Sequence, residues 1–170
     1  MRQTRLGSLF LIFCAALPFR AIAAEDRPSI EQQFNTAYKA FRTAARDNNA
    51  EAQHQHATVA LRLGSDLFAE DSQTLAVLTM NAALAYPTAW GLLPAHTALP
   101  LMQRLVTRYE SLFGQDSIDV IEPLLLLAET LTAYSLHSVP DESTADARTR
   151  ILDTETEIAS LTQRIYHLTK

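Results

Sequence analysis

The chain has 170 residues, a formal net charge of −5, 48% hydrophobic residues and a single cysteine. This length suits one domain with a hydrophobic core of its own. The acidic balance, without any basic run, argues against nucleic-acid binding, because phosphates require clustered Lys and Arg. Few glycines together with abundant alanine and leucine favour helices. We therefore expect an all-α protein that does not bind nucleic acid.

The first 23 residues have the pattern of a secretory signal peptide. Arg2 and Arg5 give a basic start, residues 9–17 form an unbroken apolar run, and residues 21–23 (Ala-Ile-Ala) place small side chains before a cleavage site. The apolar run is too short to cross a bilayer, which takes roughly 20 residues. We predict a signal peptide over 1–23 and a single exported domain over 24–170. The alternative is an uncleaved leader that tethers the protein to a membrane.

Removal of this leader would change the chemistry of the exported domain. Cys14, the only cysteine, lies inside the apolar run, so the domain would contain no disulfide. The leader also holds Arg2, Arg5 and Arg20 and no acidic residue, so the charge would change from −5 to about −8. A cysteine-free exported domain fits a bacterial periplasm. We therefore predict a periplasmic protein with no transmembrane span after cleavage.

Apolar residues recur at helical spacing along the rest of the chain. A first helix is predicted from Ser29 and ends at residues 47–49 (Asp-Asn-Asn), which also cap a second helix over 50–68. Residues 70–72 (Glu-Asp-Ser) form a loop and the N-cap of a third helix over 73–86.

A longer connection over 87–94 contains two prolines, a glycine and Trp90. A fourth helix is predicted to start at Thr97, with Pro100 in its first turn, and to end before Gly114.

The remaining chain predicts two more helices. Residues 116–117 (Asp-Ser) cap a fifth helix that reaches about Leu136, and Pro123 either kinks it or marks the start of its regular part. The sixth helix begins at an N-cap pair, Ser143 and Asp146, and runs to Leu168. Its apolar residues form a narrow seam that we expect to dock on the domain instead of building a coiled coil: Ile151, Ile158, Leu161, Ile165 and Leu168.

An internal repeat relates two of the predicted joints at an offset of 45 residues. LFAEDSQTL (67–75) aligns with LFGQDSIDV (112–120), and in both segments an apolar helix end is followed by a turn, a Ser cap and a new helix. A weaker echo at an offset of 46 relates Asn35 to Asn81. The repeat predicts three helix pairs whose stacking builds a continuous core, over residues 29–69, 72–114 and 117–168.

These segments resemble tetratricopeptide repeats, in the longer form of about 42 residues found in kinesin light chains and many bacterial proteins. LFGQDS is similar to the family's inter-helix turn, and LTMNAALAY (78–86) is similar to its first helix. The resemblance covers most of residues 29–136. The chain departs from the pattern in the insertion at 87–94 and at Leu126, where the pattern has Asn. The helical part of periplasmic TonB-type energy transducers is also similar. The resemblance implies a tetratricopeptide-like α-solenoid of about three helix pairs.

The resemblance also implies a binding groove lined by the first helix of each pair. Asn35 and Asn81 are then groove candidates, because a carboxamide pairs with both the N–H and the C=O of a bound backbone. Lys39 and Arg42 follow Asn35 by one and two turns and would add charge selection. Trp90 is either an exposed binding aromatic or an anchor packed on the core. For the other four residues, the alternative is ordinary solvated helix surface.

The chain shows no catalytic, metal-binding or cofactor-binding pattern. His54 and His56 diverge by about 200° on a helix, whereas helical metal ligands need i, i+3 or i, i+4 spacing. Nucleophile elbows and phosphate-binding glycine loops are missing from the sequence. We therefore predict a non-enzymatic periplasmic scaffold or adaptor that binds a protein or peptide of the cell envelope. The alternatives are a structural homodimer through the last helix and a small-molecule or lipid carrier whose cavity opens near Trp90.

Overall fold

The computed structural model describes residues 28–86, 95–137, 139 and 141–170. Within these ranges the protein is all-α, as predicted, with six α-helices and no strand. The helices are α1 (Ile30–Arg46), α2 (Ala50–Leu67), α3 (Gln73–Leu84), α4 (Ala95–Phe113), the 3₁₀ helix η2 (Ile118–Val120), α5 (Ile121–Leu136) and α6 (Thr144–Leu168). The predicted leader and Trp90 lie outside the described residues.

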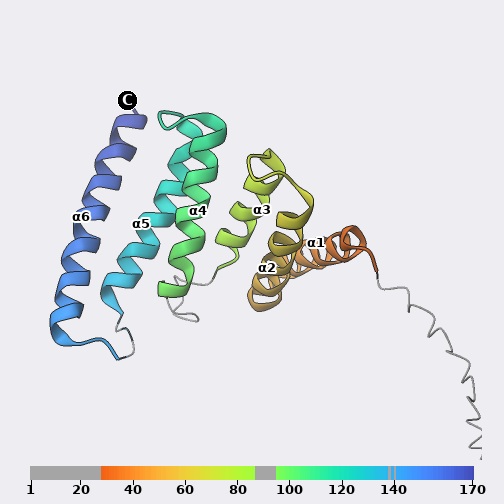
Figure 1. Ribbon diagram of the computed structural model, residues 1–170, viewed down its shortest axis with the longest axis horizontal. Coiled ribbons are helices and arrows are strands. Elements are labelled where there is room, and N and C mark those ends of the chain that lie inside the picture. The colour runs from red at the N-terminus through yellow and green to blue at the C-terminus, as the bar shows by residue number, and fades with distance from the viewer. Residues whose placement is uncertain (1–27, 87–94, 138, 140) are drawn as a thin grey trace, which may run out of the picture.

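The helices follow one another across the molecule in chain order (Figure 1). α1 and α2 form a hairpin at one end of the row, and α6 lies at the other end. Each helix packs mainly on its neighbours in sequence, and α3 also contacts α5. This layout leaves one side of the terminal hairpin and one side of α6 without a neighbouring helix among the described residues.

Side-chain caps define the predicted helix starts. Asn48 adopts a positive φ of 52° in the turn after α1, and the Asn49 side chain accepts a hydrogen bond of 3.1 Å from the Ala52 amide. Ser143 caps α6 in the same way, accepting 3.2 Å from the amide of Asp146. These caps satisfy amide groups that a helix start leaves without a helical partner.

The two joints related by the internal repeat have matching local structure. Ser72 accepts a hydrogen bond of 3.2 Å from the Leu75 amide, and Ser117 accepts one of 3.2 Å from the Asp119 amide. The aligned apolar residues Leu75 and Val120 are both fully buried, with 0% exposure. The aligned positions therefore cap the next element and fill the core at both joints.

The second joint differs because of Pro123. Ser117 leads into η2, and α5 begins only at Ile121, so Pro123 is its third residue. A proline is tolerated there because the first-turn amides of a helix have no intrahelical acceptor. Of the two alternatives, the regular helix therefore begins close to Pro123.

The predicted boundaries of two helices are wrong by two residues. α3 ends at Leu84 and not at Tyr86, and α4 begins at Ala95 and not at Thr97. Pro100 is therefore the sixth residue of α4 and lies beyond its first turn. The early start includes Ala95, which is buried with 6% exposure, and this burial outweighs the local start signals.

The core has a larger region over α3–α6 and a smaller one over α1–α3. The larger cluster centres on fully buried side chains such as Met102, Leu105 and Leu124, and the smaller clusters include Phe41, Leu61 and Leu63. The docking seam predicted for the sixth helix is confirmed, since four of its five residues pack on the larger cluster: Ile158, Leu161, Ile165 and Leu168.

Arg108 of α4 is a buried cation that joins three elements. Its side chain is 5% exposed, and its Nη2 lies 2.7 Å from Oε1 of Glu70 in the α2–α3 joint. Its Nη1 donates to the Thr79 hydroxyl on α3. Because Arg provides several donors in a fixed plane, this one side chain of α4 bonds to the α2–α3 joint and to α3 at the same time.

Arg164 of α6 makes a similar contact at the joint between α4 and η2. Its Nη1 lies 2.5 Å from Oε1 of Glu110 on α4, and its Nη2 donates 2.7 Å to the backbone carbonyl of Gln115. Gln115 occupies the position that aligns with Glu70 in the repeat. At both joints, an arginine from a later helix therefore bonds to the residue at this aligned position.

Candidate binding face on α1

One side of α1 carries polar side chains at helical spacing and does not enter the core. Asn35, Lys39, Arg42 and Arg46 are separated by four, three and four residues, which places them on one stripe of the helix. All four are exposed. The opposite side of α1 packs into the core through Ala37 and Phe41. The helix is therefore amphipathic and presents the polar stripe to solvent.

An open recess of about 520 Å³ follows this stripe. Its walls are formed by Asn35, Tyr38, Lys39, Arg42, Thr43 and Arg46. The Tyr38 ring is held by neighbours on both sides, with ring centroids 5.9 Å from Phe34 and 6.0 Å from Phe41. The recess therefore combines a fixed aromatic wall with an amide and three cations.

The charge of this recess is opposite to that of the whole protein. Arg46 forms an ion pair of 3.1 Å with Asp47, but both side chains are well exposed, at 75% and 55%. Among the described residues, Lys39 and Arg42 form no ion pair. On a chain of net charge −5, such a local concentration of positive charge attracts an anionic partner.

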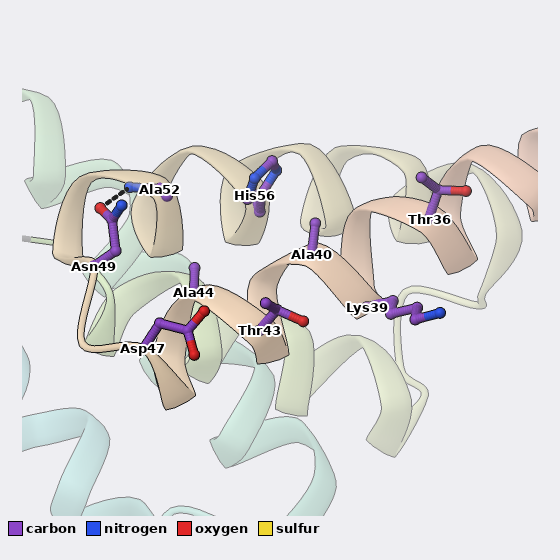
Figure 2. Close-up of a pocket in the computed structure, with 9 residues that line it drawn as sticks. All are labelled: Thr36, Lys39, Ala40, Thr43, Ala44, Asp47, Asn49, Ala52 and His56. Atoms are coloured by element: carbon purple, nitrogen blue, oxygen red, sulfur yellow. Dashed lines mark hydrogen bonds between the residues drawn. The ribbon is translucent and has the colours of Figure 1, made fainter.

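A second hollow, of about 600 Å³, lies between α1 and α2 (Figure 2). Small side chains from both helices, Ala40, Ala44 and Ala52, leave the space open. Lys39 and Thr43 line this groove as well as the recess. The two hollows are therefore adjacent, and we call them together the α1 face.

The structure brings together three of the five predicted binding residues. Asn35, Lys39 and Arg42 all line the recess. Asn81 lies on α3, is half-buried and is not among the residues that line either hollow. Trp90 falls outside the described residues, so its predicted role has no structural description.

Three features of the α1 face were not predicted from the sequence. Arg46 lies four residues after Arg42 and continues the polar stripe. The same helical spacing that relates Asn35, Lys39 and Arg42 would have identified it. Tyr38 gave no sequence signal for the recess, because an aromatic residue at helical spacing indicates a core-facing side. Its half-buried side chain contacts Phe34 and Phe41 and also lines the recess. The groove between α1 and α2 had no sequence signal, because alanines that leave space resemble alanines that fill a core.

The two helical histidines lie in different surroundings. The His54 ring meets Tyr86 edge-on, with centroids 4.8 Å apart, whereas His56 lines the groove between α1 and α2. Over the described part of the chain, no group of three or more His, Cys, Asp or Glu is arranged to hold a metal ion. In the same residues, no helix combines the length and apolarity needed to cross a bilayer.

No family model matches the chain, and no curated protein is similar enough to match it. The α1 face therefore has to be interpreted from its own geometry and charge.

Proposed function

We propose that this protein is a non-enzymatic scaffold that binds an acidic segment of a partner protein at the α1 face. The observation that carries the proposal is the gathering of Lys39, Arg42 and Arg46 in one exposed recess of an acidic protein. Guanidinium and ammonium groups pair with carboxylates, and the Asn35 carboxamide is available for a bound backbone.

The expected ligand is a short peptide with two or more carboxylates and one apolar side chain. The carboxylates would pair with Lys39 and Arg42, and the apolar side chain would contact Tyr38 or enter the groove beside Ala40. Exposed charge pairs contribute little affinity each, so the apolar anchor supplies much of the binding energy.

The proposal includes a tetratricopeptide-like solenoid of three stacked helix pairs. It is supported by the chain-order packing of the helices and by the equivalent caps at Ser72 and Ser117. The contacts of Arg108 and Arg164 with successive joints add a second, independent regularity. In such arrays each unit contacts only its neighbours and presents an extended surface to ligands.

A titration with a labelled peptide tests this function. The probe is a fluorescent peptide of alternating Glu and Leu, and the measurement is its anisotropy at low and at physiological salt. We expect Lys39→Glu/Arg42→Glu to weaken binding at least tenfold, and wild-type affinity to fall as salt rises.

A charge-matched control separates the α1 face from general electrostatics. Arg62→Glu/Arg104→Glu makes the same change in net charge at two exposed positions, on α2 and α4. This variant should keep most of the affinity. Equal losses in the two variants would show that only the overall charge matters, and no binding by the wild type would overturn the proposal.

The location of the protein is part of the proposal. The basic start, apolar run and small-residue exit of residues 1–23 support export to a periplasm. An intact mass beginning at Ala24, from protein recovered in the periplasmic fraction, is the expected result. A mass that includes Met1 or Arg2 would instead support a tethered adaptor.

A further inference from the structure

The outward side of α6 carries a second apolar seam, separate from the one that docks on the core. Leu152 and Tyr166 are both 57% exposed, although they are large hydrophobic side chains. They alternate at intervals of seven residues with Ala145 and Ala159, which are also exposed. Residues seven apart lie on one side of a helix, so these four form a continuous strip, which we call the outer seam.

The outer seam is flanked by the exposed charges of Arg148 and Glu155 on one side and by uncharged residues on the other. Thr149, Thr156 and Gln163 run beside it at the same spacing of seven residues, and all three are exposed. α6 lies at the edge of the row of helices (Figure 1), and its helix contacts are with the elements before it. Nothing in the described chain therefore covers the outer seam.

The charges at the two ends of α6 are opposite. Asp146 lies in its first turn and Asp141 precedes it, whereas His167 lies in its last turn. Lys170 places its Nζ 4.2 Å from the centre of the Tyr166 ring, next to the end of the seam. A second α6 running in the opposite direction would bring each acidic end against a basic end, and its dipole would also be favourably oriented.

We propose that the outer seam binds a second copy of this chain, so that two α6 helices pack antiparallel about a two-fold axis near residues 155–156. In this register Ala145 faces Tyr166 of the second copy, and Leu152 faces its Ala159. Each layer of the contact then places a large side chain against a small one, which permits close packing. A parallel pair would instead place Tyr166 against Tyr166 and acid against acid.

The size of the seam predicts a weak dimer. α6 has 25 residues and is therefore about 37 Å long and about 10 Å wide. A contact of this kind buries roughly 700 Å² in total, below the ~1,200 Å² of standard stable interfaces. We therefore expect a dissociation constant on the order of 100 µM, typical of a transient contact.

Sedimentation of the full chain at increasing concentration tests the dimer. We expect the wild type to shift from monomer to dimer between about 5 and 500 µM, and Leu152→Glu to remain monomeric. Tyr166→Glu is a second variant at an equally exposed position. Deletion of α6 is unsuitable, because Ile158 and Leu161 on its inner side cover the core.

The control is Leu84→Glu on α3, where a leucine of similar exposure, 54%, lies away from α6. This variant should dimerise like the wild type. A wild-type protein that stays monomeric at about 500 µM, or a dimer that persists in Leu152→Glu, would overturn the proposal.

Cross-linking distinguishes the direction of the two helices. In a Cys14→Ser background, Thr156→Cys should be joined efficiently by a short bis-maleimide, because residue 156 lies beside the two-fold axis. Ala145→Cys should not, since the two copies of residue 145 would be about 30 Å apart at 1.5 Å per residue. Equal cross-linking at both positions would indicate parallel helices and would contradict the proposed register.

Discussion

His54 is a half-buried side chain on α2 whose Nδ1 atom is enclosed and has no hydrogen-bond partner within the described structure. Its ring meets the edge of Tyr86, which closes the site from the α3 side. Burial lowers the pKa of His54 below its ordinary value of 6.5, because the protonated ring loses hydration. The neutral imidazole is therefore the form that fits the folded protein.

This lowered pKa predicts a pH dependence of stability. The unfolded chain binds the proton more tightly, so the free energy of unfolding should decrease as the pH falls through 6.5. The contribution of the neutral His54 ring to the free energy of unfolding is fully present only above that pH. An NMR titration of the His54 ring should give a midpoint below 6.5, and His54→Gln should reduce the difference in urea stability between about pH 7.5 and 5.5. A midpoint at or above 6.5 would show that the ring is solvated.

Arg150 forms a nearly buried ion pair with Glu142, and its contribution to stability depends on that burial. Its Nε lies 2.8 Å from Oε1 of Glu142, and the two side chains are only 9% and 13% exposed. Its other nitrogens donate to the carbonyls of Tyr134 and His137, at the end of α5. The hydrogen bonds that Arg150 donates to the Glu142 carboxylate raise the pKa of Arg150, so this cation remains charged throughout the accessible pH range.

Removal of this guanidinium should be costly. Arg150→Ala leaves the Glu142 carboxylate buried without a partner and frees two carbonyls, so we expect a loss of about 3 kcal/mol in the free energy of unfolding. Arg148→Ala, at an exposed position two residues earlier, should change it by less than about 0.5 kcal/mol. Urea denaturation of both variants provides the measurement. Similar effects would mean that the buried pair contributes nothing specific.

At the scale of single helices, much of the structure could be predicted because the signals are local. Asn49, Ser72 and Ser143 cap helices by accepting hydrogen bonds from amides three residues ahead, so a short window of sequence contains both partners. The start of α4 could not be predicted, since it depends on the burial of Ala95. Contacts such as Arg108 with Glu70, 38 residues apart, leave no local pattern at all.

The same distinction applies to the candidate site. Asn35, Lys39 and Arg42 could be found together because one helix presents them, and helical spacing alone places them on one stripe. Asn81 was grouped with them only through the repeat, and it lies on another helix, away from both hollows. Grooves between helices depend on which residues the packing leaves empty, so their positions require the three-dimensional structure.

Gly64 determines how closely α2 approaches α3. A Cβ atom at this position would lie 2.5 Å from Cδ1 of Leu78 and 3.6 Å from Cε2 of Phe34. Gly64→Val should therefore destabilise the protein by about 2 kcal/mol through overpacking, although glycine is otherwise the poorer helix residue. Ser65→Val, at the next, exposed position of α2, is the matched control and should be nearly neutral.

A second substitution tests the cause of this effect. In a Leu78→Ala background, the added valine at position 64 has room, and its cost should fall or reverse in sign. Thermal or urea unfolding of the two single variants and the double variant gives the coupling directly. Additive losses would place the strain somewhere other than the contact between Gly64 and Leu78.

Across the whole molecule, chain-order packing divides the core into regions that share few residues. Leu63 belongs to a cluster with Ala37 and Ala60, formed by α1 and α2 alone. Leu131 belongs to the larger cluster over α3–α6. Stacked helix pairs behave approximately as a sum of local stabilities and nearest-neighbour contacts, whereas a single cooperative domain unfolds as one unit.

Hydrogen exchange can distinguish these two behaviours. Leu63→Ala should cost about 3 kcal/mol and should lower amide protection in α1 and α2, with little change in α5 and α6. Leu131→Ala, an equally buried leucine in the other region, should produce the reverse pattern. The basis is that α3 is the principal structural link between the two regions, so local opening on one side need not propagate to the other. A uniform decrease across all helices in both variants would instead indicate a single cooperative unit and would count against the stacked-repeat architecture.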